Sequence, residues 1–180
     1  MEKQNKHDPK AWLRTRQVGI ERTNPAARGQ PQPQKPAMSP SGKRCWVCTQ
    51  PITWGQSDTA CNERCRAILY AESYRIARHK EESYRQNRPC NLKLSEWAET
   101  LRHYNWHCAF CQIGPFESLD HFIPTSRGGA TWVGNVVPSC LPCQAAKGNL
   151  LPEEVKAIPR ERMDRIARYL GRRAQMVSQS

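Results

Sequence analysis

The sequence predicts a small α+β protein whose helices and strands are held together by cysteine side chains rather than by one large apolar core. The chain has 180 residues, of which 38% are hydrophobic, and its mean hydropathy is −0.80, so little apolar surface is available for burial. Eight of its nine cysteines occur in close pairs. Short segments with helical and strand patterns follow one another from residue 62 onwards.

The paired cysteines form two sets of four. In each set, a CxxC pair is joined by a second pair whose members are separated by two or three intervening residues, which is the spacing of tetrahedral thiolate zinc sites. We therefore expect two structural Zn²⁺ ions. One would be held by Cys45, Cys48, Cys61 and Cys65, and the other by Cys108, Cys111, Cys140 and Cys143. The ninth cysteine, Cys90, is expected to be a free thiol in a linker.

The charge of the chain favours a polyanionic partner. With 28 Lys and Arg against 16 Asp and Glu, the formal net charge is +12, which suits binding to nucleic-acid phosphates, although such a charge also serves solubility alone. The first residues, MEKQNKHDPKAW, lack the apolar stretch of a secretory signal, and no segment is long enough to span a membrane. We expect an intracellular protein, cytoplasmic and nucleoid-associated, with DNA as partner and neither a membrane nor a small-molecule cofactor.

Composition and pattern divide the chain into five segments. The first is a disordered basic tail, which would either contact the DNA backbone or act as a linker. The second is a four-cysteine finger, which would contact DNA, contact another protein or only stabilise the fold. The expected segments are the tail at 1–44, the finger at 45–66, a helical connector at 67–107, a compact segment at 108–151 and a basic C-terminal helix at 152–180.

The connector is expected to contain two helices. The first would begin after Asn62 as N-cap and end at Pro89, and the second would begin after Ser95. Apolar residues recur in the first helix at helical spacing, which predicts that its tyrosines lie in a core or interface, with stacking on bases as the alternative. These tyrosines are Tyr70, Tyr74 and Tyr84.

The C-terminal helix is expected to begin at Pro152 or Pro159, because proline is favoured in the first turn of a helix. Its apolar stripe would dock on the rest of the protein and comprises Met163, Ile166, Leu170, Ala174 and Val177. The opposite face is rich in arginine and predicts a contact with the DNA backbone or a solvated surface. The arginines expected to contact nucleic acid are Arg165, Arg168 and Arg172.

Between the cysteine pairs of the 108–151 segment lies a polar string that a purely structural zinc site does not need. It contains Asp120-His121, Gly128-Gly129 and Asn135. We expect a strand over 118–123, a turn at the glycines, a return strand over 135–138 and a helix over 141–148. Successive strand residues point to opposite faces, so Asp120 and His121 would face different sides.

The residues DHFIPTSRGG, Asn135 and CLPCQAAKG resemble the HNH nuclease family over about residues 97–152. The resemblance implies a ββα-metal (His-Me finger) core inside a four-cysteine zinc frame, and a metal-dependent endonuclease that hydrolyses DNA phosphodiester bonds. It further implies that Asp120 is the first metal ligand, that His121 is the general base acting on water, and that Asn135 orients the imidazole by hydrogen bonds.

The family's third metal-ligand position, normally His or Asn, corresponds to Gln144. An amide oxygen beside the carboxylate of Asp120 suits Mg²⁺ or Mn²⁺, which prefer oxygen ligands. Arg127 and Lys147 are expected to contact phosphate groups. The alternative function is that of a non-catalytic zinc-finger nucleic-acid-binding protein derived from an HNH nuclease.

Overall fold

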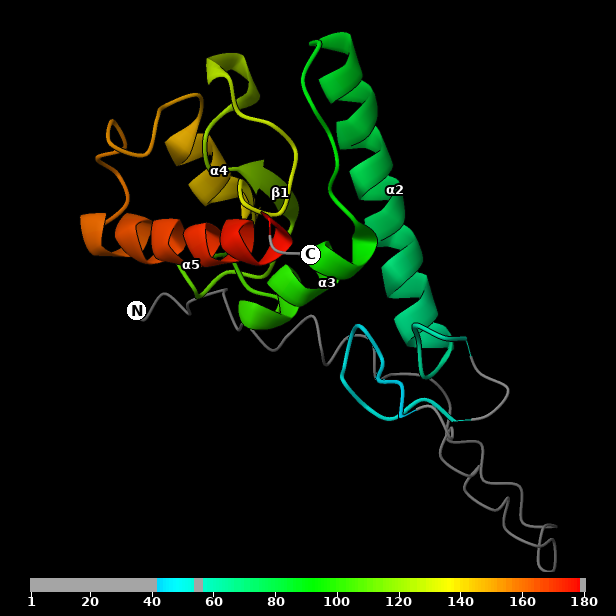
Figure 1. Ribbon diagram of the computed structural model, residues 1–180. Coiled ribbons are helices and arrows are strands. Elements are labelled where there is room, and N and C mark those ends of the chain that lie inside the picture. Colours follow the sequence, from blue (N-terminus) through cyan, green and yellow to red (C-terminus); the bar gives the residue numbers. More distant parts are fainter. Residues whose placement is uncertain (1–41, 54–56, 179–180) are drawn as a thin grey trace, which may run out of the picture. The chain divides into compact units, whose positions relative to one another are not determined.

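The computed structural model describes residues 42–53 and 57–178, which belong to the compact unit Met38–Ser180. It is a small α+β structure with a two-stranded antiparallel sheet among helices (Figure 1). Its elements are α2 (Glu63–Arg85), α3 (Leu94–His103), β1 (Ser118–His121), the 3₁₀ helix η1 (Thr125–Arg127), β2 (Val136–Ser139), α4 (Leu141–Lys147) and α5 (Arg160–Ser178). The predicted basic tail lies outside the described residues, except for residues 42–44.

Helix α2 begins where the sequence predicts. The side chain of Asn62 accepts a hydrogen bond from the backbone N–H of Cys65 at 2.9 Å, which satisfies one of the unpaired donors of the first turn. The helix ends at Arg85, four residues before Pro89. Asn87 follows in a left-handed conformation (φ 51°), which redirects the chain out of the helix.

The prediction that the α2 tyrosines lie in a core is wrong. Tyr70, Tyr74 and Tyr84 are 76%, 65% and 86% exposed. The inward face is formed instead by Cys65, Leu69, Glu72, Ile76 and Ser83. Two of these residues are polar, so the buried face cannot be recognised from hydrophobicity alone.

Buried Glu72 is tolerated on α2 because it has two partners. The indole Nε1 of Trp97 donates to Glu72 Oε2 at 2.9 Å, and the Arg75 guanidinium pairs with the same oxygen at 3.0 Å. The hydrogen bond between Glu72 and Trp97 joins α2 to α3.

Helix α3 has Lys93 as its N-cap rather than the predicted Ser95. The Glu96 carboxylate accepts the Lys93 backbone N–H at 2.9 Å and so moves the start of the helix two residues earlier.

The predicted hairpin and its helix are present with slightly different ends. Strand β1 stops at His121 rather than residue 123, and β2 pairs with it in the register Ser118↔Ser139 to His121↔Val136. Helix α4 follows β2 with Cys140 as its N-cap. The order of hairpin then helix is a ββα-like arrangement, and four-cysteine clusters flank it.

Helix α5 begins immediately after Pro159, as one of the two expected starts predicts. Residues 152–154 form a turn and residues 155–158 are also non-helical, so the start at Pro152 is wrong. The inward face of α5 is formed by Met163, Ile166, Tyr169, Leu170 and Arg173. Val177, expected in the apolar stripe, is 37% exposed because the last turns of the helix extend past the core.

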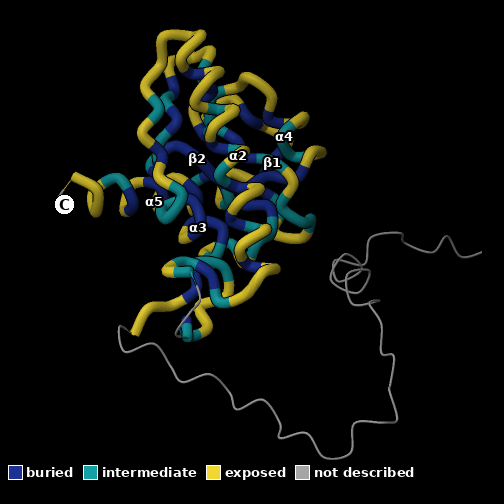
Figure 2. Tube along the Cα trace, turned by 90° about the vertical axis from the view of Figure 1, so that its right-hand side faces the viewer, coloured by how far each residue is buried: buried dark blue, intermediate teal, exposed yellow. Residues whose placement is uncertain are grey.

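Three clusters of buried side chains connect segments that the sequence separates. One joins α5 to the Cys108 region and β2, a second joins α2 and α3 to the hairpin, and a third joins the N-terminal finger to α2 and α3. Buried residues gather around β2 and α3 (Figure 2). Within the described part of the chain, no helix combines the length and apolar character needed to cross a membrane.

Candidate active site and zinc sites

The eight paired cysteines form two compact clusters, one for each predicted set. In each cluster the four sulfur atoms lie within 4.8 Å of one another, and the cysteines are free thiols. A zinc tetrahedron with Zn–S bonds of about 2.3 Å has sulfur–sulfur edges of about 3.8 Å. The Sγ atoms of Cys111 and Cys140 are 3.8 Å apart, as are those of Cys61 and Cys65. Both clusters have the composition and spacing of four-thiolate zinc sites.

Three thiols of the cluster of Cys108, Cys111, Cys140 and Cys143 differ in their pKa values. Burial raises the pKa of Cys111, but hydrogen bonds from the backbone of Gly114 and Ile113 outweigh this effect and lower it to about 7. Burial raises the pKa of Cys140 to about 11, and it also raises the pKa of Cys143, with further contributions from neighbouring sulfurs. The raised pKa values of Cys140 and Cys143 disfavour their thiolates, and a bound Zn²⁺ would offset this by neutralising the negative charge.

The cluster of Cys108, Cys111, Cys140 and Cys143 fixes both ends of the ββα segment. Cys108 and Cys111 precede β1, whereas Cys140 follows β2 and Cys143 lies in α4. The backbone reinforces this connection, since the N–H of Ala109 donates to Pro138 O at 2.8 Å. The zinc site therefore holds the hairpin against the helix that follows it.

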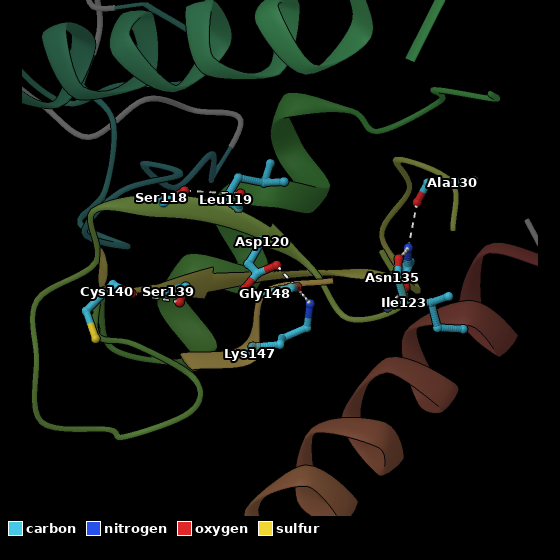
Figure 3. Close-up of polar contacts among 10 residues, drawn as sticks. All are labelled: Ser118, Leu119, Asp120, Ile123, Ala130, Asn135, Ser139, Cys140, Lys147 and Gly148. Carbon is cyan, nitrogen blue, oxygen red and sulfur yellow. Dashed lines mark hydrogen bonds and ion pairs between the residues drawn. The ribbon is translucent and has the colours of Figure 1, made fainter. Parts of the chain in front are cut away.

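Asp120 lies in the middle of β1 with its side chain directed at α4. Its Oδ1 is 3.3 Å from the ammonium of Lys147, and its buried Oδ2 has no hydrogen-bond partner among the described residues (Figure 3). Burial raises the pKa of Asp120, although the nearby Lys147 charge acts in the opposite direction. One buried carboxylate oxygen thus has no partner among the described residues.

The structure corrects the expected position of Lys147. The residue was predicted to contact phosphate groups, but its side chain is 1% exposed and forms a buried ion pair with Asp120. Lys147 follows Cys143 by four residues and Cys140 by seven, so it shares the helix face of the zinc ligands, which faces the hairpin. This spacing is a signal in the sequence that could have placed it.

Gln144 lies one turn earlier on α4 and is half-buried. Within the described residues, the Gln144 side chain makes no hydrogen bond, either to Asp120 or to any other group. The amide oxygen is therefore free to act as a ligand, but the preformed partner of Asp120 is Lys147. An ammonium and a divalent cation would compete for this carboxylate, so a metal at Asp120 requires Lys147 to withdraw from Oδ1.

His121 faces the opposite side of the strand, towards α2. Its Nε2 is 2.7 Å from Thr131 Oγ1, which in turn is 2.8 Å from Ser83 Oγ. The ring also makes an edge contact with His79, with centroids 5.3 Å apart. Burial, His79 and Lys147 together lower the pKa of His121 to about 4. The imidazole is therefore neutral at neutral pH.

Asn135 has a different role from the one the resemblance implies. Its Oδ1 accepts from the Ile123 backbone N–H at 2.8 Å, and its Nδ2 donates to Ile123 O at 3.0 Å and to Ala130 O at 2.9 Å (Figure 3). In place of the expected hydrogen bond from Asn135, the imidazole shares one between its Nε2 and Thr131 Oγ1. The hydrogen bonds of Asn135 close the loop between Ile123 and Asn135. Gly129 permits this closed loop, since a Cβ there would lie 1.9 Å from Ile123 O.

The sequence did not reveal three of the residues around His121. Thr131 follows the glycine turn, whereas Ser83 and His79 belong to α2. A backbone bridge between Cys90 and Thr131 brings the connector onto the hairpin loop. The contacts that α2 and the connector make with the hairpin join residues about 40 to 50 positions apart, and no local pattern marks them.

The other predicted nucleic-acid contacts, Arg127 and the α5 arginines, lie on the surface. Arg127 pairs with Glu154 at 3.1 Å, and Arg165 pairs with Glu161 at 2.9 Å. Arg168 and Arg172 are exposed, and neither forms an ion pair within the described part of the chain.

Searches against models of known protein families, curated proteins and solved structures gave no match to this chain.

Proposed function

We propose that the ββα segment is an active centre of the HNH type and that the protein is a metal-dependent endonuclease acting on DNA. The observation that carries the proposal is the placement of Asp120 and His121 side by side on the first strand of a hairpin, with α4 following directly and a four-cysteine cluster closing the segment. A structural zinc site alone has no need of a buried carboxylate beside an imidazole.

His121 would accept the proton of the attacking water. Its lowered pKa keeps it neutral, which a general base requires, although a low pKa also makes it a weaker base. If Nε2–H donates to the Thr131 hydroxyl, the lone pair of Nδ1 is left free for the water. Thr131 is then the positioning residue of the base, and Asn135 holds the loop that carries Thr131.

Asp120 and Gln144 would hold the divalent cation once Lys147 has withdrawn. The unpartnered Oδ2 of Asp120 and the free amide of Gln144 are oxygen donors, which Mg²⁺ and Mn²⁺ prefer. When bound, such a cation supplies positive charge to the phosphoryl oxygens and to the leaving oxygen. The net charge of +12 supports attraction of the DNA backbone.

A second candidate function is nucleic-acid binding without cleavage. The buried ion pair of Lys147 and Asp120 favours this second function, because the Lys147 ammonium already occupies the carboxylate that a catalytic metal would need. The contacts of Thr131 and His79 with His121 favour it as well, because they cover part of the imidazole. In this case the ββα segment is a zinc-stabilised scaffold.

A plasmid-nicking assay separates the two functions. Supercoiled DNA is incubated with zinc-loaded protein and Mg²⁺, Mn²⁺ or EDTA, beside His121→Ala, and DNA binding and zinc content are measured for both proteins. The proposal predicts nicking that requires Mg²⁺ or Mn²⁺ and disappears in His121→Ala while binding is retained. Binding without nicking under any metal would instead support the second function.

A further inference from the structure

A cavity of about 590 Å³ lies outside the Asp120–His121 centre, between the end of α3, the Cys108 region and α5. Volumes of this size are typical of sites for small ligands. Its lining includes Arg162, Arg165 and Arg172 and contains no Asp or Glu. The three arginines lie on one face of α5, since they are spaced by three and seven residues.

The positive charge of this cavity is only partly neutralised. Arg162 donates to the backbone carbonyls of Phe110 and Cys111, which carry no net charge. Arg165 pairs with Glu161, but that carboxylate side chain is 80% exposed, so solvent weakens the pair. Arg172 has no carboxylate partner among the described residues. An anion entering the cavity would therefore meet available guanidinium groups.

Aromatic rings form another part of the lining. His103 stacks on Tyr169 with ring centroids 4.0 Å apart and an interplanar angle of 16°, and Tyr104 packs on the same tyrosine edge-on at 5.2 Å. The Tyr169 hydroxyl is anchored to Thr100 Oγ1 at 3.1 Å inside the protein. This anchoring holds the rings in place, while His103 itself remains exposed. An exposed ring fixed by a buried one is a platform on which a base can stack.

The backbone beside these rings is also constrained. Asn105 and Trp106 have φ angles of 50° and 61°, a left-handed conformation that is uncommon for residues other than glycine. It turns the chain sharply from α3 towards Cys108, and Asn105 and His107 thereby line the cavity. The wall is thus formed by a fixed turn.

We propose that this cavity binds a nucleotide unit, with the phosphate held by Arg165 and Arg172 and the base stacked against His103. The combination of partly neutralised arginines and an aromatic platform fits a phosphate joined to an aromatic ring better than it fits either part alone. The ligand is a free mononucleotide or one unit of a nucleic-acid strand. The site goes beyond the proposed nuclease function, because it requires no chemistry at His121.

Isothermal titration calorimetry of the full-length, zinc-loaded protein tests this site. The probes are dAMP, deoxyadenosine, inorganic phosphate and a short single-stranded oligo-dT. We expect dAMP to bind at least about tenfold more tightly than deoxyadenosine or phosphate, since it uses both parts of the cavity. Arg172→Gln should weaken dAMP binding at least about fivefold. The matched control Arg168→Gln removes the same charge from an exposed position on α5 outside the cavity and should change binding less than about twofold.

Further arms identify the base contact and the source of the ligand. His103→Ala should weaken the binding of dAMP but not the binding of phosphate. His121→Ala should leave dAMP binding unchanged, whether the proposed nuclease function is right or wrong. An Arg172-dependent preference for dAMP over oligo-dT assigns the site to free nucleotides, and the reverse preference assigns it to a strand. Equal binding of dAMP and phosphate, or equal losses in Arg172→Gln and Arg168→Gln, would overturn the proposal in favour of general charge attraction.

Discussion

The buried ion pair between Lys147 and Asp120 gives a sharp test of the site geometry. Lys147→Met keeps a similar side-chain length but removes the ammonium that lies 3.3 Å from Asp120 Oδ1. The carboxylate, 9% exposed and already without a partner at Oδ2, would lose its counterion. Removing one member of a buried pair costs about 3–5 kcal/mol. Burial already raises the pKa of Asp120, so protonation would relieve part of this cost and favour the lower end of the range.

Urea unfolding with excess zinc, followed by circular dichroism at pH 7, measures this loss. The control is Lys156→Met, because Lys156 is exposed and forms no ion pair within the described residues. We expect the control to change the free energy of unfolding by less than about 0.5 kcal/mol. Adding Asp120→Asn to Lys147→Met should recover at least about 1 kcal/mol, since the unpaired charge is gone. A loss below about 1 kcal/mol in Lys147→Met would refute the buried pair.

Three further predictions follow from the fold. Elemental analysis should give about two zinc ions per chain, and Cys143→Ser should lose one of them, whereas a value near zero for the wild type would refute both sites. Tyr70→Ala and Tyr84→Ala should each change the free energy of urea unfolding by less than about 0.5 kcal/mol, because these side chains are exposed; a loss above about 2 kcal/mol would show that they are buried. Asn135→Ala should cost about 1–3 kcal/mol in the same assay, since the backbone groups of Ile123 and Ala130 lose their hydrogen bonds to this buried side chain, and an unchanged stability would contradict the closed loop.

Local signals in the sequence predicted the parts of the fold that depend on neighbours in the chain. Asn62 caps α2 because its side chain reaches the backbone three residues on, and Pro159 precedes α5 because proline suits the start of a helix. The cysteine spacings predicted both clusters for a similar reason, since two residues between ligands allow one turn to present both sulfurs.

The parts that the sequence did not predict depend on contacts between distant segments. The buried face of α2 contains Glu72, which becomes acceptable only when Trp97 and Arg75 supply hydrogen bonds. Ser83 of α2 meets Thr131 across 48 positions of the chain, where the connector bridges to the hairpin loop through Cys90. In such cases the burial of a residue is decided by its partners, which no periodicity reveals.

Replacing Gln144 tests the central claim that the Asp120–His121 hairpin is a phosphodiesterase centre. The measurement is the initial rate of supercoiled-plasmid nicking with Mn²⁺ by wild type, Gln144→His and the double variant Gln144→His/His121→Ala. We predict slow nicking by the wild type, an equal or higher rate for Gln144→His because imidazole is a stronger ligand for borderline metals, and none for the double variant. An absence of nicking in all three proteins, each zinc-loaded and binding DNA, would contradict the claim and leave a nucleic-acid-binding scaffold.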